Sequence, residues 1–249
     1  MNAIDRLMAI AEGEVGYREK RTNSRLDEKD ANAGSGNYTK YNRDLRAWTG
    51  VGSLNAQWCQ AFVDWCFIRA FGLEGAKRLI YVWTNYTPTG SGAFKNRGRY
   101  VPRGKGTPAR GDVIYFYSAS KGRIGHVGIV SGVSNGKVYT IEGNAGDGVK
   151  RKHYSLTSRY IDGYGRVDYT QAAQEDAAGG AVTVTGSSVR VRTGPGAEHP
   201  TLAIVHRGDR LPCLGSDGES GWYRVTCGGA EGFISGRYAR LEEGGEADE

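Results

Sequence analysis

The sequence has 249 residues, of which 39% are hydrophobic and 24% are charged, with a formal net charge of +6. This length allows one large domain or two modest ones. No apolar run approaches the roughly 20 residues that a membrane-spanning helix needs, so no such helix is expected. The 39 glycines and 15 tyrosines, with few long helical patterns, favour a protein rich in strands and turns.

The charge is unevenly distributed along the chain. Residues up to Tyr169 include 26 Lys and Arg against 15 Asp and Glu, a net charge of +11, whereas the remainder carries 7 against 12, a net charge of −5. A basic first part indicates an anionic partner, either a bacterial envelope polymer or a nucleic acid. Charge alone does not separate the two, and no nucleic-acid-binding motif accompanies it.

The first residues predict a helix and not a signal peptide. Asp5 and Arg6 interrupt the apolar pattern, and Leu7, Met8 and Ala11 recur with a helical period. We therefore expect a helix over residues 2–13 and a protein made in the cytoplasm. Its four cysteines do not have the spacing of a disulfide framework.

Residues 58–71 are almost all apolar and predict a helix that is buried on all sides. Cys59 falls in its first turn, where the helix dipole and unpaired backbone N–H groups favour a thiolate. Cys59 is therefore a candidate nucleophile, although a free cysteine also serves as a small buried hydrophobe. Cys66 lies two turns deeper on the same face and is interpreted as core packing.

The pattern changes from helices to strands after about residue 106, which predicts an α+β domain of residues 1–169 with N-terminal helices packed on an antiparallel sheet. A further short helix is expected at 41–48. The predicted strands of this domain are 112–117, 126–130, 137–142, 149–154 and 160–167. The turn Ser134-Asn135-Gly136 predicts a hairpin between the second and third of these strands.

A second, all-β domain is predicted beyond a linker at residues 170–181. Six short strands separated by turns indicate a small barrel over residues 182–242. These strands are expected at 182–184, 189–192, 202–205, 210–214, 222–226 and 232–234. Residues 243–249 are acidic and are expected to form a disordered tail.

A nucleophilic cysteine needs a base, and the base needs an orienting group. His126 opens an apolar strand; alone such a histidine is usually structural, but beside Cys59 it indicates a general base. Glu142 and Asn144 are two residues apart on the next strand and are expected to share a face. Glu142 is predicted to accept a hydrogen bond from His126 Nδ1, which leaves Nε2 for the thiol. Asn144 is predicted to do the same or to polarise a substrate carbonyl.

Zinc chemistry is the alternative for the same residue types. Cys59, Cys66, His126 and His153 are the available ligands in the first domain. The two cysteines are seven residues apart within one helix, which does not match the close pairs of structural zinc sites. His153 lies in a charged stretch that indicates a solvated strand face.

Three separated motifs resemble the CHAP domain, namely Trp58–Cys66, Gly125–Val130 and Ile141–Asn144. That family comprises cysteine, histidine-dependent amidohydrolases and peptidases with a papain-like fold that cut bacterial peptidoglycan. The resemblance covers residues 1–169. It implies Cys59 as nucleophile, His126 as base, Glu142 as its orienting group and Asn144 as a polar helper.

One departure from the family concerns metal binding. Some members hold calcium in an Asp-x-Asp-Gly loop just before the cysteine, whereas residues 51–55 here contain no carboxylate. We therefore predict that no metal or other cofactor is required and that activity survives a chelator.

Residues 189–196, with later Gly-Trp-Tyr and Gly-Phe-Ile segments, resemble a bacterial SH3 domain. Such domains commonly bind wall peptides or glycans, which implies a wall-binding role for the predicted SH3-like barrel. Trp222 and Tyr223 are candidates for its ligand face, although packing within the barrel explains either equally well, and a non-binding spacer is the alternative. Cys213 is predicted to face Tyr223, which leaves Cys227 too far away for a disulfide.

These observations predict a monomeric peptidoglycan hydrolase, either an N-acetylmuramoyl-L-alanine amidase or an endopeptidase. The missing signal peptide favours a phage or prophage endolysin that acts on the wall after release, with a bacterial autolysin as the alternative. A non-catalytic wall-binding protein is the competing class, with stem or cross-bridge peptides and teichoic acid as partners in either case.

Overall fold

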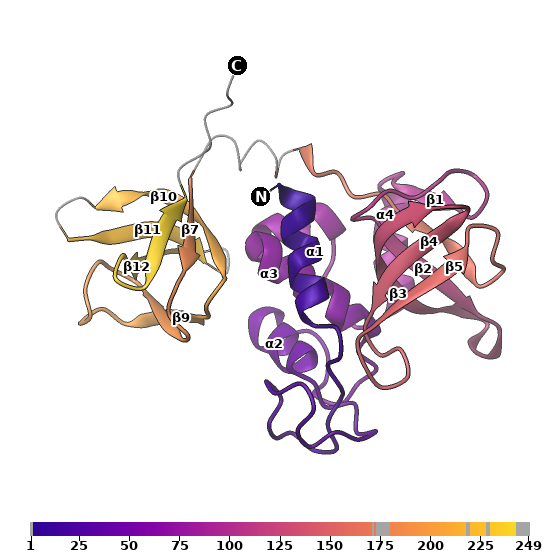
Figure 1. Cartoon of the computed structure of the whole chain (residues 1–249), viewed down its shortest axis with the longest axis horizontal. Helices are drawn as coiled ribbons and strands as arrows, with labels where there is room; N and C mark the ends of the chain where they lie inside the picture. Colours follow the sequence, from indigo (N-terminus) through magenta and orange to yellow (C-terminus); the bar gives the residue numbers. More distant parts are fainter. Residues whose placement is uncertain (1, 171, 173–179, 218–219, 228–229, 243–249) are drawn as a thin grey trace. The chain divides into compact units, whose positions relative to one another are not determined.

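The computed structural model describes residues 2–170, 172, 180–217, 220–227 and 230–242. The chain divides into two compact units, a larger one of residues 4–68 and 76–168 and a smaller one that contains the described residues from Tyr169 onward (Figure 1). Most of the predicted linker at 170–181 and the whole predicted tail at 243–249 lie outside the described residues.

Four α-helices belong to the first part of the chain: α1 (Ala3–Gly13), α2 (Lys40–Thr49), α3 (Cys59–Ile80) and α4 (Thr87–Asn96). Thr39 caps α2 by accepting a hydrogen bond from the Asn42 amide. Within α3, Gly72 is not helical, with φ 68° and ψ 174°, so a break falls directly after residue 71, where the predicted helix ends. A second helical segment, which was not predicted, follows the break. The helix α4 has no counterpart among the helices whose bounds were predicted.

The larger unit contains a six-stranded antiparallel sheet in the order β1-β6-β2-β3-β4-β5. Its strands are β1 (Tyr100–Pro102), β2 (Val113–Ser118), β3 (Arg123–Ser134), β4 (Lys137–Glu142), β5 (Lys150–Ser155) and β6 (Ile161–Gly165). A short 3-10 helix, Ala119–Lys121, joins β2 to β3. The predicted α+β class, with helices before an antiparallel sheet, is confirmed.

The helix α3 lies in the core of the larger unit. Ala61, Phe62, Val63 and Cys66 are completely buried, as a helix that is apolar on all sides requires. The end of β4 packs directly on this helix: a Cβ added at Gly143 would lie 2.5 Å from the Phe62 Cβ. Only glycine permits this approach, which fixes the start of α3 against the sheet.

An aromatic cluster holds the start of α3 from the other side. Tyr41 stacks on Trp58 with ring centroids 5.4 Å apart and contacts Phe62 and Trp65 edge-on. The Trp58 indole N–H donates to Glu19 Oε2 at 2.7 Å, which satisfies a buried donor. The residue before Cys59 is therefore fixed by both packing and a hydrogen bond.

The smaller unit contains seven antiparallel strands in the order β13-β7-β10-β11-β12-β8-β9. They are β7 (Ala181–Val184), β8 (Val189–Arg192), β9 (Thr201–Val205), β10 (Arg210–Asp217), β11 (Trp222–Cys227), β12 (Ala230–Ser235) and β13 (Ala239–Glu242). The strand β13 was not predicted. The result is an SH3-like β domain, and the strand pairs of the described residues form one continuous sheet without a closing pair.

The predicted register of Cys213 is wrong. Cys213 lies opposite Val225, and Tyr223 lies opposite Ser216. The reason is that Asp217 pairs with Trp222, so the two strands are symmetric about a point beyond residue 218, from which the prediction counted. The β-bulge between Cys213 and Gly215 moves the partner of Cys213 back by only one residue. All four cysteines of the chain are free.

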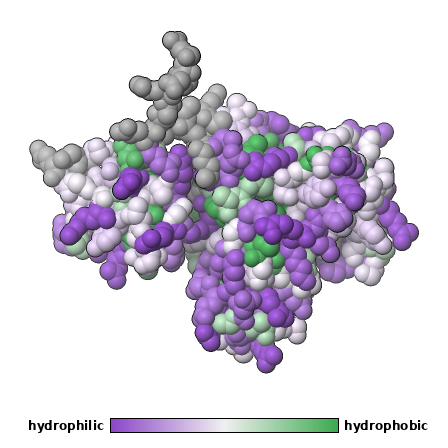
Figure 2. Space-filling view, viewed as in Figure 1, coloured by the Kyte–Doolittle hydropathy of each residue, from purple (hydrophilic) through white to green (hydrophobic). Residues whose placement is uncertain are grey.

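Hydrophilic side chains cover most of the visible surface, with only small separate hydrophobic areas between them (Figure 2). Within the described parts of the chain, no helix combines the length and apolar character needed to cross a bilayer.

Candidate active site

Cys59 is the first residue of α3. Trp58 precedes the helix with φ −120° and ψ 12°, and its side chain provides no capping hydrogen bond. The backbone N–H groups of the first turn have no partners within the helix, so they present a positive potential beside the thiol. Cys59 is 5% exposed, whereas Cys66 two turns later is completely enclosed, and burial raises the pKa of the Cys66 thiol well above its ordinary value.

His126 lies on β3, which pairs with β2 so that His126 is opposite Phe116. The two rings pack with centroids 5.7 Å apart. This packing and the strand fix the imidazole at the sheet surface, where its side chain remains 27% exposed. The ring can therefore reach both the protein interior and a bound molecule.

The His126 ring connects Cys59 to Glu142. His126 Nε2 lies 2.9 Å from Glu142 Oε2, and the ring also forms a hydrogen bond with the Cys59 thiol. The predicted use of the two nitrogens is therefore reversed, since Nε2 faces the carboxylate and Nδ1 is left for the sulfur. Strand alternation does not determine which ring nitrogen faces the carboxylate.

Glu142 is 1% exposed and has hydrogen-bond donors on both oxygens. Thr140 Oγ1 donates to Oε1 at 2.6 Å, and the Tyr154 hydroxyl donates to Oε2 at 3.2 Å. Gly128 leaves room for the glutamate, because a Cβ there would lie 2.6 Å from Glu142 Cγ. The carboxylate is therefore held toward His126 by neighbours on three strands.

This environment changes the protonation of His126. Burial by itself lowers the pKa of the imidazole, but hydrogen bonds with Cys59 and Glu142 and the negative charges of both groups raise it to about 10. The ring is therefore an imidazolium at neutral pH. A positive ring beside a thiol and a buried carboxylate is the electrostatic arrangement of an activated cysteine.

Asn144 does not share a strand face with Glu142, contrary to the prediction. The strand β4 ends at Glu142, and Asn144 has a left-handed φ of 56°. Its amide Nδ2 donates to Gln57 Oε1 at 3.2 Å. Asn144 thus holds the side chain two residues before Cys59. The alternation argument fails because the strand ends at Glu142 and the turn begins at Gly143.

Three contributors to the site were missed in the sequence. Thr140 lies two residues before Glu142 on the same strand, so the period of two that was applied to Asn144 would have identified it. Gln57 precedes the nucleophile by two residues and was not among the candidates. Tyr154 has no sequence signal, since its contact depends on the pairing of β5 with β4.

A second buried carboxylate lies deeper in α3. Asp64 accepts hydrogen bonds from Gln60 Nε2 at 2.9 Å and from the Thr84 backbone N–H at 3.0 Å. Burial outweighs these two bonds and raises the pKa of Asp64 to about 7. The buried Gln60 Oε1 has no hydrogen-bond partner.

The two binding candidates of the smaller unit differ in their surroundings. Trp222 lines a groove, whereas Tyr223 packs against the core formed by residues such as Val191, Val225 and Ile234. Among the described residues, no group of three or more His, Cys, Asp or Glu side chains is arranged to hold a metal ion.

Family models match both units. Residues 50–144 match the CHAP domain, and residues 187–239 match the bacterial SH3 domain. The chain therefore combines a CHAP domain with a bacterial SH3 domain, the architecture of a cell-wall hydrolase. The CHAP match contains Cys59, His126, Glu142 and Asn144. It supports a peptidoglycan hydrolase that acts on the bacterial wall.

No curated protein matches the sequence. Among solved structures, Ly7917 is similar with a TM-score of 0.39 and 15% identity over 96% of this chain and 97% of that chain. An NlpC/P60 family protein from Bacillus cereus has a TM-score of 0.25 and 16% identity over 48% of this chain and 37% of its own. NlpC2 from Trichomonas vaginalis has a TM-score of 0.23 and 13% identity over 57% and 47%. Because these TM-scores are below 0.5, the family models carry the assignment.

Proposed function

We propose that this protein hydrolyses an amide bond of peptidoglycan with Cys59 as the nucleophile. The observation that carries the proposal is the His126 ring, which bridges the Cys59 thiol and the buried Glu142 carboxylate. A thiol, an imidazolium and an orienting carboxylate in one hydrogen-bonded row are the components of covalent acyl transfer. Asn144 belongs to the proposal as a positioning residue that acts through Gln57.

The chemistry proceeds in two halves. The Cys59 thiolate, paired with the His126 imidazolium, attacks the carbonyl carbon of the wall amide, and the C–N bond breaks as His126 Nδ1 donates its proton to the departing amine. The neutral ring then takes a proton from the water that attacks the thioester carbon. The C–S bond breaks, which releases a carboxylic acid and restores the Cys59 thiolate and the His126 imidazolium. Glu142 keeps the ring in place during both halves.

The start of α3 supplies the donors for the tetrahedral oxyanion. The Cys59 N–H belongs to the uncapped first turn of the helix. Gln57 adds a second donor: its Oε1 is occupied by Asn144, so its Nε2 remains to donate to the substrate oxygen. Asn144 thus fixes which end of the Gln57 amide faces the substrate.

The proposal is tested by mass spectrometry of the fragments released from purified Gram-positive peptidoglycan. The Cys59→Ala variant is expected to lower the release rate by a factor on the order of 10³–10⁶. The Cys66→Ala variant is the matched control, because it removes a thiol from the same helix at a completely buried position. Equal release by wild type and Cys59→Ala would refute the mechanism.

The fragments also identify the bond. Intact stem peptides separated from the glycan define an amidase, whereas cut stems or cross-bridges define an endopeptidase. Both reactions fit the proposed mechanism, because each breaks an amide bond through the same thioester.

As a finer proposal, the protein acts as an endolysin that is made in the host cytoplasm and reaches the wall after release. Expression inside a bacterium is expected to leave the culture intact until a membrane-permeabilising protein is co-expressed. Lysis without that protein would contradict the proposal.

A further inference from the structure

The smaller unit contains a groove of about 1050 Å³ that is separate from the proposed active site. Residues from the loop before β8, from β8 itself, from the start of β11 and from the β12–β13 connection line it. Its volume is at the upper end of the range for small-molecule pockets, about 300–1,000 Å³. The groove therefore has room for a segment of a polymer.

Arginine is concentrated in this groove. Arg190, Arg192, Arg207 and Arg237 line it, whereas none of its lining residues is an Asp or a Glu. Residues 170–249 contain only seven basic residues against 12 acidic ones. Four of the seven positive charges of a net acidic segment thus line one concave surface.

The groove arginines differ from two other arginines of the same unit, each of which pairs with a glutamate. Arg210 pairs with Glu242 at 2.7 Å, and Arg224 pairs with Glu231 at 3.5 Å. In the described part of the chain no carboxylate pairs with the four groove arginines. Arg192 donates to the His199 carbonyl, which holds its guanidinium without neutralising it. Their charge is available to an external anion.

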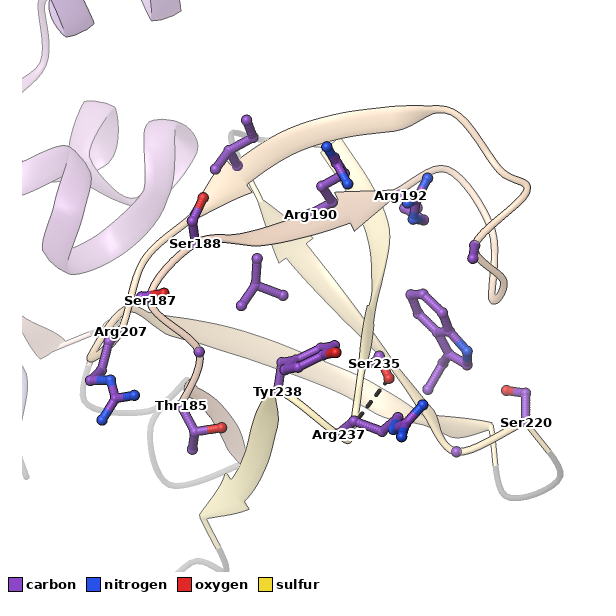
Figure 3. A pocket seen from close by; sticks show the side chains of 16 residues that line it. Thr185, Ser187, Ser188, Arg190, Arg192, Arg207, Ser220, Ser235, Arg237 and Tyr238 are labelled. Carbon is purple, nitrogen blue, oxygen red and sulfur yellow. Dashed lines mark hydrogen bonds between the residues drawn. The ribbon is translucent and has the colours of Figure 1, made fainter.

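Strand alternation explains one wall of the groove. Val189 and Val191 on β8 point into the core, so Arg190 and Arg192 point outward together. Figure 3 shows these two arginines on one wall and Arg237 and Tyr238 on the opposite wall. Tyr238 is 51% exposed, and Trp222 also lines the groove. Hydroxyl groups, including those of Ser187 and Ser235, complete the surface.

We propose that this groove binds a phosphate-bearing glycan or polyol polymer of the bacterial wall. Arginine forks match phosphate oxygens, and charges on both walls suit a ligand with repeated anionic groups. The aromatic rings of Tyr238 and Trp222 offer flat faces to sugar or polyol carbons, and the hydroxyl groups of the groove can form hydrogen bonds with those of the polymer. That the polymer comes from the wall rests on the proposed function; its anionic character rests on the groove alone.

The test measures binding of the full chain carrying Cys59→Ala, so that cleavage does not alter the wall. The probes are wall sacculi before and after acid extraction of their phosphate polymers, and purified poly(glycerol phosphate) with polyglutamate as a carboxylate comparison. We expect binding to the phosphate polymer to exceed binding to polyglutamate and to weaken with salt. The double variant Arg190→Ala/Arg237→Ala is expected to lower the affinity on the order of tenfold.

Arg240→Ala is the matched control, because Arg240 is an exposed arginine of the same unit outside the groove. It is expected to bind like the parent, and equal melting temperatures of all variants exclude unfolding as the cause of any loss. Equal affinities of the double variant and Arg240→Ala, or binding that survives extraction of the phosphate polymers, would overturn the proposal. Preference for polyglutamate would overturn it in favour of a carboxylate ligand. If the proposed catalytic function were refuted, these binding results would not change, so failure of the binding proposal and failure of the catalytic proposal are distinguishable.

Discussion

Glu142→Gln is the substitution that tests the electrostatics of the site most directly. It keeps the shape of the side chain and an oxygen for His126 Nε2, but it removes the negative charge that lies 2.9 Å from the ring. A hydrogen bond to a charged group contributes about 1.5–3 kcal/mol. At about 1.4 kcal/mol per pKa unit, its loss should lower the pKa of His126 by about 1–2 units.

The sign of the effect follows from the direction of the shift. The pKa of His126 is raised from 6.5 to about 10 in the folded protein. The interaction therefore stabilises the fold fully below about pH 6.5, and this stabilisation is lost as the pH rises toward 10. In the variant, the alkaline limb of the pH–activity profile should move from about 10 to about 8–9. The decline in stability should begin at about the same pH of 6.5, but it should end earlier and be smaller.

The assay is the rate of fragment release between pH 5 and pH 11, with circular dichroism at each pH to confirm folding. Glu28→Gln is the control, because Glu28 also pairs with a cation, Arg25 at 2.7 Å, but on the exposed surface of the same unit. The control should keep the wild-type profile. An identical alkaline limb in wild type and Glu142→Gln would refute the assigned role of the carboxylate.

Three further substitutions are informative. Gly128→Ala should lower activity about 10–100-fold, because its Cβ would displace the orienting carboxylate. Gly132→Ala on the same strand is the control: its Cβ would have no atom within 4 Å, so activity should not change. Asn144→Gly keeps the left-handed backbone but loses the amide, so wall cleavage should fall on the order of tenfold and show no additivity with Gln57→Ala in a double-mutant cycle. Asp64→Asn should raise the melting temperature at about pH 8 but not at about pH 4. The pKa of the Asp64 carboxyl is raised to about 7, so its buried negative charge develops only as the pH rises. Equal shifts of the melting temperature at both pH values would contradict this.

The hairpin that carries the base and its partner was predictable from local chemistry. Asn135 and Gly136 both adopt positive φ, 47° and 69°, as the turn between β3 and β4 requires. The resulting pairing puts Ile129 opposite Ile141, so Glu142 lies beside Gly128 and two positions from His126. The proximity of the base and the carboxylate thus follows from turn chemistry and strand alternation.

Other parts of the site depend on tertiary structure and were not predictable. Strand alternation places His126 near Glu142 but does not determine that Nε2 is the ring nitrogen that faces the carboxylate. Tyr154 reaches the carboxylate only through the pairing of β5 with β4. Asn144 was misplaced because a left-handed residue directly after a strand ends the alternation, and the sequence Glu-Gly-Asn does not show at which residue this happens.

The proposed nucleophile and its base belong to different layers of the larger unit. Cys59 is on a helix and His126 is on a sheet, and the tight packing of Gly143 on Phe62 joins the two layers. A newly made chain can therefore form α3 and the β3–β4 hairpin and still have no reactive centre until they dock. Such a chain would be latent during its synthesis, and renaturation followed by both circular dichroism and wall cleavage should show secondary structure returning before activity.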